Sequence, residues 1–294
     1  MTQSREANAG ISGHIPRLPT RTAASRDYFL ILLRCREFSL RQASSKWATM
    51  GKQMPDMDIK VYPDPGALFR AAAETITKAL QSALDERGNA TFVLSGGSTP
   101  RGVYENLGCA RERPDWARVE FFWGDERCVP PDDKASNFYL VQSSLLFRLT
   151  VPERNIHRIQ ADLKDSNSAA RLYEEEIRAR VPGSPLPRFD LVLLGMGDDG
   201  HTASLFPGAL WDATRLVVST YSPHPPYRRV SMTPPLLNAA RLAVFLVSGF
   251  AKAPALKRVI EEPGCDFPAR LIQPSPGNLI WMVDQAAASL LRST

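Results

Sequence analysis

The chain has 294 residues, of which 44% are hydrophobic and 23% are charged, a composition typical of an ordinary folded protein. No apolar run approaches the roughly 20 residues that a membrane span needs. The net charge of +5 is concentrated in residues 1–54, which hold nine basic and three acidic residues, so the rest of the chain is close to neutral. We therefore expect neither nucleic acid nor a membrane as partner.

Residues 1–55 differ in composition from the rest of the chain. They are rich in Arg and Ser, poor in acids and interrupted by Pro16 and Pro19, which predicts a basic, disordered N-terminal extension before a folded domain over residues 56–294. Such a segment can also be an organellar transit peptide, or the product of an early start, because Met54 and Met57 are both possible initiators. We favour the tail or the start artefact over targeting, and therefore a cytoplasmic protein.

The four cysteines, Cys35, Cys109, Cys128 and Cys265, are widely scattered, and no pair has CxxC spacing. This pattern argues against a zinc site and favours reduced thiols in a cytosolic protein.

From Asp58 onward, apolar periodicity predicts alternating strands and helices. Short apolar runs predict strands at 59–62, 91–94, 119–123, 189–194, 216–220, 242–247 and 279–283. Helical spacing is found at 66–86, 100–107, 135–149, 167–180 and 251–261, and an Ala-rich helix ends the chain. This order predicts an α/β fold with a doubly wound, mostly parallel sheet and helices on both faces, resembling a Rossmann fold. Ligands of such folds bind at the carboxyl ends of the strands.

The first loop of interest, residues 95–100, follows the strand that ends at Leu94. Gly96 and Gly97 allow the backbone to approach a ligand closely, and Ser98 and Thr99 are candidate caps for the next helix. Backbone N–H groups at a helix start form an anion site, so phosphate binding by Ser95–Ser98 is one interpretation. A simple strand–turn–helix junction is equally compatible with these residues.

A second strand end carries charge, because three aromatic residues are followed by Asp125, Glu126 and Arg127. An arginine at this place can hold an oxyanion or a phosphate. On local sequence alone, an Asp–Arg salt bridge at the loop entrance is the favoured interpretation.

Residues 195–200 formally match GxGxxG after a strand, which suggests a dinucleotide site. We reject that interpretation because Asp198 and Asp199 would repel a pyrophosphate, and because no acid ends the next strand to hold a ribose. The loop instead ends in Asp199-Gly200-His201, a carboxylate two residues from an imidazole. This pair is a candidate general base with its orienting partner.

Further cations are expected near the same edge of the sheet. Arg229 precedes an apolar run, and Lys252 follows the strand that ends at Val247. Arg228 is more simply explained as a solvated surface charge. One sheet edge would then combine an anion-binding turn, two or three cations and a histidine beside a carboxylate, which predicts hydrolysis or isomerisation of a small phosphorylated metabolite.

The chain resembles the 6-phosphogluconolactonases of the glucosamine-6-phosphate deaminase-like superfamily over about residues 59–288. The motifs that carry the resemblance are LSGGSTP (94–100), WGDERCVP (123–130), SNF (136–138), FDLVLLGMGDDGHTASLFPG (189–208), RVSMTPPLLNAA (229–240) and SGFAKAPAL (248–256).

The resemblance implies hydrolysis of 6-phospho-D-glucono-1,5-lactone in the pentose phosphate pathway, with no metal or cofactor, by a monomer or weak dimer. His201 would activate water, Asp199 and Gly197 would belong to its loop, and Arg127 would lie near the reacting carbonyl. The implied phosphate ligands are Ser95, Gly96, Gly97, Ser98, Arg229 and Lys252.

Two alternatives stay open at this point. Deaminases of the superfamily typically carry a glutamate five residues after the loop histidine and a tyrosine after the Asp-Glu pair, where this chain has Phe206 and Arg127. Both differences favour the lactonase. Pro234-Pro235 is a smaller departure, since leucine then proline is commoner there. A non-catalytic sugar-phosphate sensor is the alternative from another class, and the intact Asp199–His201 pair argues against it.

Overall fold

The computed structural model describes residues 58–212 and 214–292, so the predicted extension over residues 1–55 lies outside the described residues. A seven-stranded sheet forms the centre of the described part, and every neighbouring pair of its strands is parallel. In order across the sheet, the strands are β1 (Asp58–Tyr62), β10 (Asn278–Asp284), β9 (Leu242–Val247), β6 (Leu191–Gly195), β2 (Ala90–Leu94), β3 (Val119–Trp123) and β5 (Ile156–His157).

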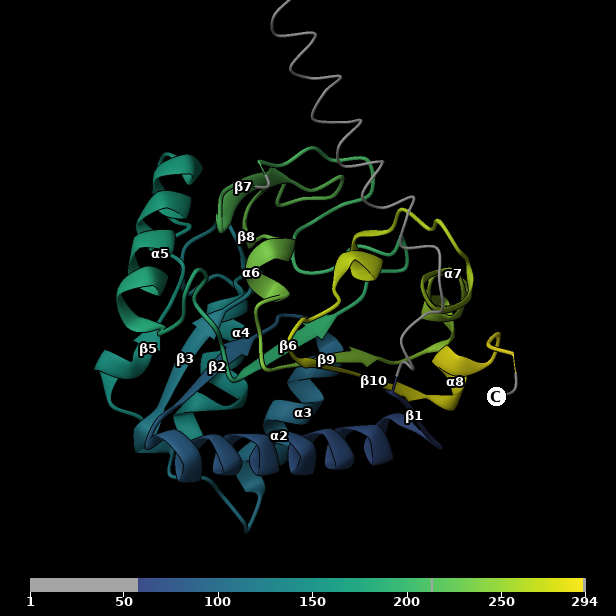
Figure 1. The fold of residues 1–294 in the computed structure, drawn as a ribbon, viewed down its shortest axis with the longest axis horizontal. Helices are drawn as coiled ribbons and strands as arrows, with labels where there is room; N and C mark the ends of the chain where they lie inside the picture. The colour runs from purple at the N-terminus through teal and green to yellow at the C-terminus, as the bar shows by residue number, and fades with distance from the viewer. Residues whose placement is uncertain (1–57, 213, 293–294) are drawn as a thin grey trace, which may run out of the picture. The chain divides into compact units, whose positions relative to one another are not determined.

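Helices cover both faces of this sheet, with α2 and α3 below it and α6 and α7 above it in Figure 1. The predicted α/β class is therefore confirmed. The helices are α2 (Pro65–Arg87), α3 (Ser98–Cys109), α4 (Asn137–Ser144), α5 (Ser166–Arg180), α6 (Pro234–Leu237), α7 (Ala253–Glu261) and α8 (Gln285–Ala288). Short 3₁₀ turns are η1 (Trp116–Arg118), η2 (Leu146–Arg148), η3 (Glu153–Asn155), η4 (Phe250–Lys252) and η5 (Pro268–Leu271). None of the described helices is long and apolar enough to cross a bilayer.

Helix α2 shows how closely local sequence determines an element. The Asp64 side chain accepts a 2.8 Å hydrogen bond from the backbone N–H of Ala67, and Pro65 occupies the first turn, where its missing N–H costs nothing. Gly88 ends the helix with φ of 81°, a left-handed conformation that glycine adopts readily. The predicted apolar stripe of the helix is buried in the core.

A second, three-stranded antiparallel sheet was not predicted. It consists of β4 (Asp125–Arg127), β8 (Arg228–Met232) and β7 (Val217–Tyr221), in that order. Residues 216–220 were expected in a single mostly parallel sheet, residues 125–127 were expected just beyond a strand end, and no strand was predicted over residues 228–232. That assignment was wrong because β4 is only three residues long and begins one residue after β3, so it has no periodicity of its own.

Two other boundaries differ from prediction. The helix expected over residues 135–149 ends at Ser144 as α4 and continues as the separate turn η2. Helix α3 begins at Ser98 with Gly97 as its N-cap, and no side chain caps it. The expectation that Ser98 and Thr99 cap this helix was therefore wrong, because both residues already lie inside it.

The order of strands creates one crevice at the carboxyl end of the sheet. After β2 the chain proceeds outward through β3 to β5, whereas after β6 it proceeds outward in the opposite direction through β9 to β10. Strands β2 and β6 are neighbours, so the loops that follow them leave the sheet side by side. This is the topological switch point at which open α/β sheets bind ligands.

Candidate active site

A cavity of about 180 Å³ lies at this switch point, and eight of the ten site residues predicted from the sequence line it. These eight are Ser95, Gly96, Gly97, Ser98, Arg127, Gly197, His201 and Lys252. The fold therefore gathers residues from the loop after β2, the strand β4, the loop after β6 and the turn after β9. The other two predicted residues, Asp199 and Arg229, do not line it, but each lies next to a residue that does.

His201 and Asp199 form a hydrogen-bonded pair in the loop after β6. Asp199 Oδ1 lies 2.6 Å from the ring Nδ1 of His201 and accepts a 3.1 Å hydrogen bond from its backbone N–H. A carboxylate can only accept, so Nδ1 must carry the proton that is shared with it. In the neutral ring the free lone pair is then on Nε2, which makes Nε2 the basic atom of this cavity-lining residue.

The charge state of Asp199 follows from competing effects. Partial burial raises the pKa of its carboxyl group, but hydrogen bonds from the ring and the backbone N–H of His201, with the attraction of that ring, outweigh burial and lower the pKa to about 2. Asp199 is therefore ionised throughout the neutral range and holds the imidazole in one orientation.

The GxG pattern of this loop makes room for the pair. A Cβ on Gly197 would lie 2.1 Å from Nδ1 of His201 and 2.5 Å from Oδ1 of Asp199. Gly200 has φ of 80°, and a Cβ there would meet the Phe267 ring at 2.2 Å. Among the glycines that resemble a dinucleotide fingerprint, Gly197 thus makes room for the histidine–aspartate pair, and Gly200 makes room for Phe267.

Phe206 packs against the ring of the same histidine. It is 7% exposed, and its ring centroid lies 4.7 Å from that of His201. Five residues after the histidine, where the sequence comparison with deaminases expects a glutamate, the structure therefore has an apolar wall. His201 has one carboxylate partner on its own loop, which is Asp199.

The turn after β2 presents an uncapped helix start to the cavity. Gly97 has φ of 105°, and no side chain accepts hydrogen bonds from the first turn of α3. The turn is anchored by Tyr104, whose hydroxyl donates to the Ser95 carbonyl at 2.8 Å and accepts from the Ser95 N–H at 2.9 Å. Burial raises the pKa of Tyr104, which keeps this hydroxyl protonated. The arrangement suits an anion at the helix start.

The backbone of Arg127 is held by its neighbour Glu126. Within the described residues, the Arg127 side chain forms no ion pair. The Glu126 carboxylate is buried and accepts backbone hydrogen bonds from Arg127, Asn137 and Phe138 at 2.7 to 2.8 Å. Burial raises the pKa of Glu126, and these N–H donors act in the opposite direction. The Arg127 guanidinium donates to the Ala135 carbonyl at 2.5 Å. The local Asp–Arg salt bridge favoured from sequence is therefore replaced by an arginine that faces the cavity.

Sequence reasoning missed three polar residues around the cavity. Asp125 and Asn137 line it although both are buried, and the Asn137 amide donates to the Asp125 backbone carbonyl at 2.9 Å. Ser204, also buried, donates to Asp125 Oδ2 at 2.5 Å. Asn137 also explains Gly96, since a Cβ on Gly96 would lie 1.9 Å from Asn137 Oδ1. Two features of the sequence could have indicated these residues: the charged residues directly after a buried strand, which include Asp125, and the SNF motif, which contains Asn137.

Arg229 lies beside Arg127, because the two residues are partners in the β4–β8 ladder and so project from the same face. Burial lowers the pKa of Arg229, and repulsion from Arg127 lowers it further. Arg228, one residue earlier, projects from the opposite face of β8 and lines a different cavity. It therefore does not assist Arg229 in this site.

Lys252 reaches the cavity from the turn that follows β9. The buried Asp284 carboxylate, at the end of β10, accepts hydrogen bonds from the Ser248 hydroxyl at 2.5 Å and the Gly249 N–H at 3.1 Å. These bonds fix the turn three residues before Lys252, which lines the same cavity as the Ser95–Ser98 turn.

The switch-point cavity, its uncapped helix start and its histidine–aspartate pair define an α/β protein built for a small anionic ligand and for base chemistry beside it. A family model described as glucosamine-6-phosphate isomerases/6-phosphogluconolactonase matches residues 63–281, and the chain belongs to this family.

Individual relatives agree with that membership. A 6-phosphogluconolactonase of Synechocystis sp. is 40% identical over 244 residues, which cover 81% of this chain and 99% of that protein. A 6-phosphogluconolactonase of Rattus norvegicus is 37% identical over 240 residues, which cover 79% of this chain and 93% of that protein. The crystal structure of a 6-phosphogluconolactonase from Thermotoga maritima matches with a TM-score of 0.70 at 31% identity, covering 78% of this chain and all of that one.

Proposed function

We propose that this protein hydrolyses 6-phospho-D-glucono-1,5-lactone to 6-phosphogluconate, the lactonase step of the pentose phosphate pathway. The observation that carries the proposal is the pair formed by His201 and Asp199, which places a free basic nitrogen in a cavity that also holds an uncapped helix start and two cations.

In the reaction, Nε2 of His201 takes a proton from water while the water oxygen attacks the lactone carbonyl carbon. Arg127 stabilises the negative charge that develops on the carbonyl oxygen. The carbon–oxygen bond of the ring ester then breaks, and the imidazolium returns its proton to the departing ring oxygen. Asp199 stays ionised and stabilises the imidazolium between these two proton transfers.

The lactone is hydrolysed by water even without an enzyme, so the rate enhancement that the enzyme must provide is moderate. A positioned histidine base typically contributes about 10² to 10⁴ in rate, and one oxyanion donor contributes about 10² to 10³. His201 and Arg127 together would therefore supply about 10⁴ to 10⁷ in rate.

The phosphate group of the substrate would bind at the start of α3. Backbone N–H groups of the Ser95–Ser98 turn supply donors, the helix dipole favours an anion, and Lys252 adds positive charge from the wall of the same cavity. Arg229 stays a predicted phosphate ligand, and its position beside Arg127 would let one dianion relieve the repulsion between the two guanidiniums.

Steady-state kinetics with two substrates test the phosphate site. Lys252→Gln should raise KM for the phosphorylated lactone by roughly tenfold or more, the loss of one charge-assisted contact, and should barely change hydrolysis of glucono-1,5-lactone. Lys257→Gln, on the same helix region but outside the cavity, should match the wild type. Equal losses on both substrates in the Lys252 variant would refute the assignment.

A direct assay separates the alternatives. Acid release from freshly prepared phosphorylated lactone, followed in a pH-stat with the spontaneous rate subtracted, should rise with enzyme concentration. A non-catalytic sensor would bind the compound without turnover, and a deaminase would release ammonia from glucosamine 6-phosphate. Phe206, which stands against His201 in place of an acid, favours the lactonase over the deaminase.

We further propose a cytoplasmic monomer or weak dimer. The three cysteines in the described part of the chain, Cys109, Cys128 and Cys265, are all free thiols. N-terminal sequencing of the mature protein would test the location, and light scattering would test the oligomeric state. Removal of residues 1–55 together with an organellar location would contradict a cytoplasmic protein.

A further inference from the structure

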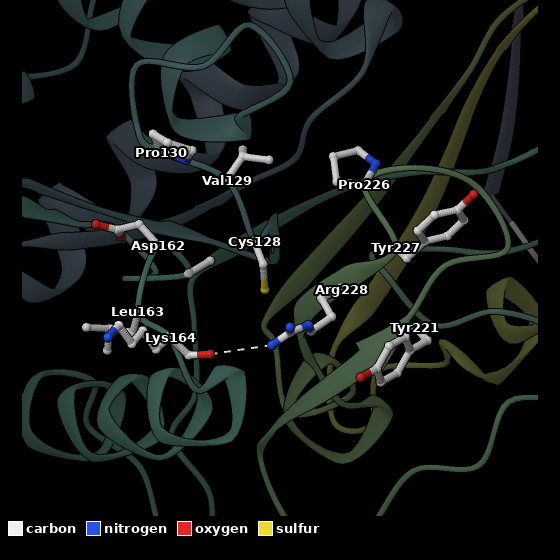
Figure 2. Close-up of a pocket in the computed structure, with 11 residues that line it drawn as sticks. Cys128, Val129, Pro130, Asp162, Leu163, Lys164, Tyr221, Pro226, Tyr227 and Arg228 are labelled. Atoms are coloured by element: carbon white, nitrogen blue, oxygen red, sulfur yellow. Dashed lines mark hydrogen bonds between the residues drawn. The ribbon is translucent and has the colours of Figure 1, made fainter.

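A second cavity of about 510 Å³ lies beside the small sheet and shares no lining residue with the candidate active site (Figure 2). Its walls come from the segment after β4, the loop before α5 and the connection between β7 and β8. Its volume falls within the range of about 300 to 1,000 Å³ that is usual for small-molecule sites.

The cavity carries positive charge that has no carboxylate partner within the described residues. Arg228 and Lys164 line it, and the Arg228 guanidinium makes only a long hydrogen bond of 3.4 Å, to the Lys164 carbonyl. The acid on the wall, Asp162, is occupied by a 2.8 Å ion pair with Arg158, whose hydrogen bond lowers the pKa of Asp162. The guanidinium therefore keeps most of its donors available, and an anion is the fitting acceptor.

Aromatic surface is exposed at the same cavity. Tyr221 is 66% exposed and Tyr227 is 56% exposed, although large apolar rings normally gain by burial. Tyr221 and Arg228 are partners in the β7–β8 ladder, so their side chains leave the same face, and Figure 2 shows Arg228 between Cys128 and Tyr221 in that view. The backbone bond from Ser222 N–H to the Tyr227 carbonyl, 2.7 Å long, fixes the connection that carries these rings.

We propose that this cavity binds a nucleoside phosphate. Its phosphate would be held by Arg228 and Lys164, and its base would lie against the exposed ring of Tyr221, with Tyr227 at the rim. A planar guanidinium can donate two hydrogen bonds to two oxygens of one phosphate, and bases of every type stack on aromatic side chains. The pairing of two cations with exposed aromatic rings selects this class over a sugar phosphate, which offers an anion without a flat base.

Calorimetric titration of the full-length protein with AMP tests the proposal independently of turnover. AMP should bind, whereas adenosine and inorganic phosphate should each bind at least about tenfold more weakly, because each offers only half of the contacts. Arg228→Gln and Tyr221→Ser should each weaken AMP binding by roughly tenfold, while Lys252→Gln, in the other cavity, should leave it unchanged.

Four results would overturn the proposal. They are no heat with AMP at millimolar concentration, phosphate or adenosine binding as tightly as AMP, equal binding in the Arg228→Gln and wild-type proteins, and loss of binding in Lys252→Gln. Arg171→Gln, an exposed change on α5 outside this cavity, serves as the matched charge control, and circular dichroism verifies that each variant is folded.

Discussion

The Ser204 hydroxyl donates a 2.5 Å hydrogen bond to Oδ2 of Asp125, and this bond fastens the loop of the candidate base to the strand of the candidate oxyanion donor. Ser204 lies three residues after His201, and Asp125 lies two residues before Arg127. Two further bonds hold Ser204 on the small sheet: its N–H donates to Ser231 Oγ at 3.1 Å, and its carbonyl accepts from the Thr220 hydroxyl at 2.9 Å. The unpredicted sheet thus helps to set the distance between the two candidate catalytic groups, His201 and Arg127.

Ser204→Ala tests this connection. Removal of the donor leaves the buried Asp125 carboxylate with one fewer hydrogen bond, so the free energy of unfolding should fall by about 1 to 3 kcal/mol. We expect kcat/KM to fall by roughly tenfold, because the histidine loop is less firmly placed. Ser143→Ala, which removes an exposed hydroxyl on α4, should change stability by less than about 0.5 kcal/mol. Wild-type activity in Ser204→Ala would argue against a positioning role.

Gly197→Ala separates the histidine–aspartate pair without altering either residue. The new Cβ would occupy the space of the 2.6 Å hydrogen bond, so one of the two side chains must move. We expect kcat to fall by at least about tenfold with a smaller change in KM. Gly124→Ala, whose Cβ would make only ordinary contacts of 3.5 Å or more, is the control that should keep most activity. If the Gly197 variant kept wild-type kcat, the pairing would be irrelevant to turnover.

The low pKa of Asp199 predicts how stability depends on pH. In the folded protein the pKa is about 2, below the ordinary value of 3.8 for an aspartate. The contribution of the ionised group is therefore complete above about pH 5 and is lost as the pH falls from there through about 2. The difference in free energy of unfolding between wild type and Asp199→Asn should be constant above about pH 5 and should shrink below about pH 4. A difference that grew on acidification would contradict the assignment.

Asp199→Asn should also lower turnover. The amide cannot stabilise the charged imidazole ring between the two proton transfers, so kcat should fall in steady-state assays of the phosphorylated lactone. A kcat equal to that of the wild type would indicate that Asp199 does not act on the base.

Ser248→Ala tests how Lys252 is placed. Loss of the bond to Asp284 loosens the turn, so KM for the phosphorylated lactone should rise several-fold while kcat stays close to wild type. Ser248→Thr, which keeps the hydroxyl, should restore KM, and Ser289→Ala, an exposed change on the neighbouring segment, should have no effect. A fall in kcat alone would contradict a role confined to phosphate binding.

The local sequence pattern was sufficient to predict those helices and strands that bury a continuous apolar surface. Helix α2 and the central strands β2 and β6 carry their periodicity, caps and breakers within a few residues, and the order of strands and helices then predicted the parallel sheet. The loops after β2 and β6 were expected at one edge for the same reason.

The small sheet and its polar network could not be predicted in this way. β4 pairs with β8 about a hundred residues further along the chain, and Ser204 meets Asp125 only once that pairing exists. The start of α3 was also misjudged, because the unusual φ of Gly97 places Ser98 inside the helix instead of at its cap.

The measurement that bears most directly on the proposed mechanism is turnover of freshly prepared 6-phospho-D-glucono-1,5-lactone by His201→Ala, corrected for spontaneous hydrolysis. We predict that kcat falls by about 10² to 10⁴, while KM changes little and the protein stays folded. His224→Ala, which changes an exposed histidine outside the cavity, should behave as wild type. Turnover by His201→Ala close to that of the wild type would contradict the assignment of His201 as the base.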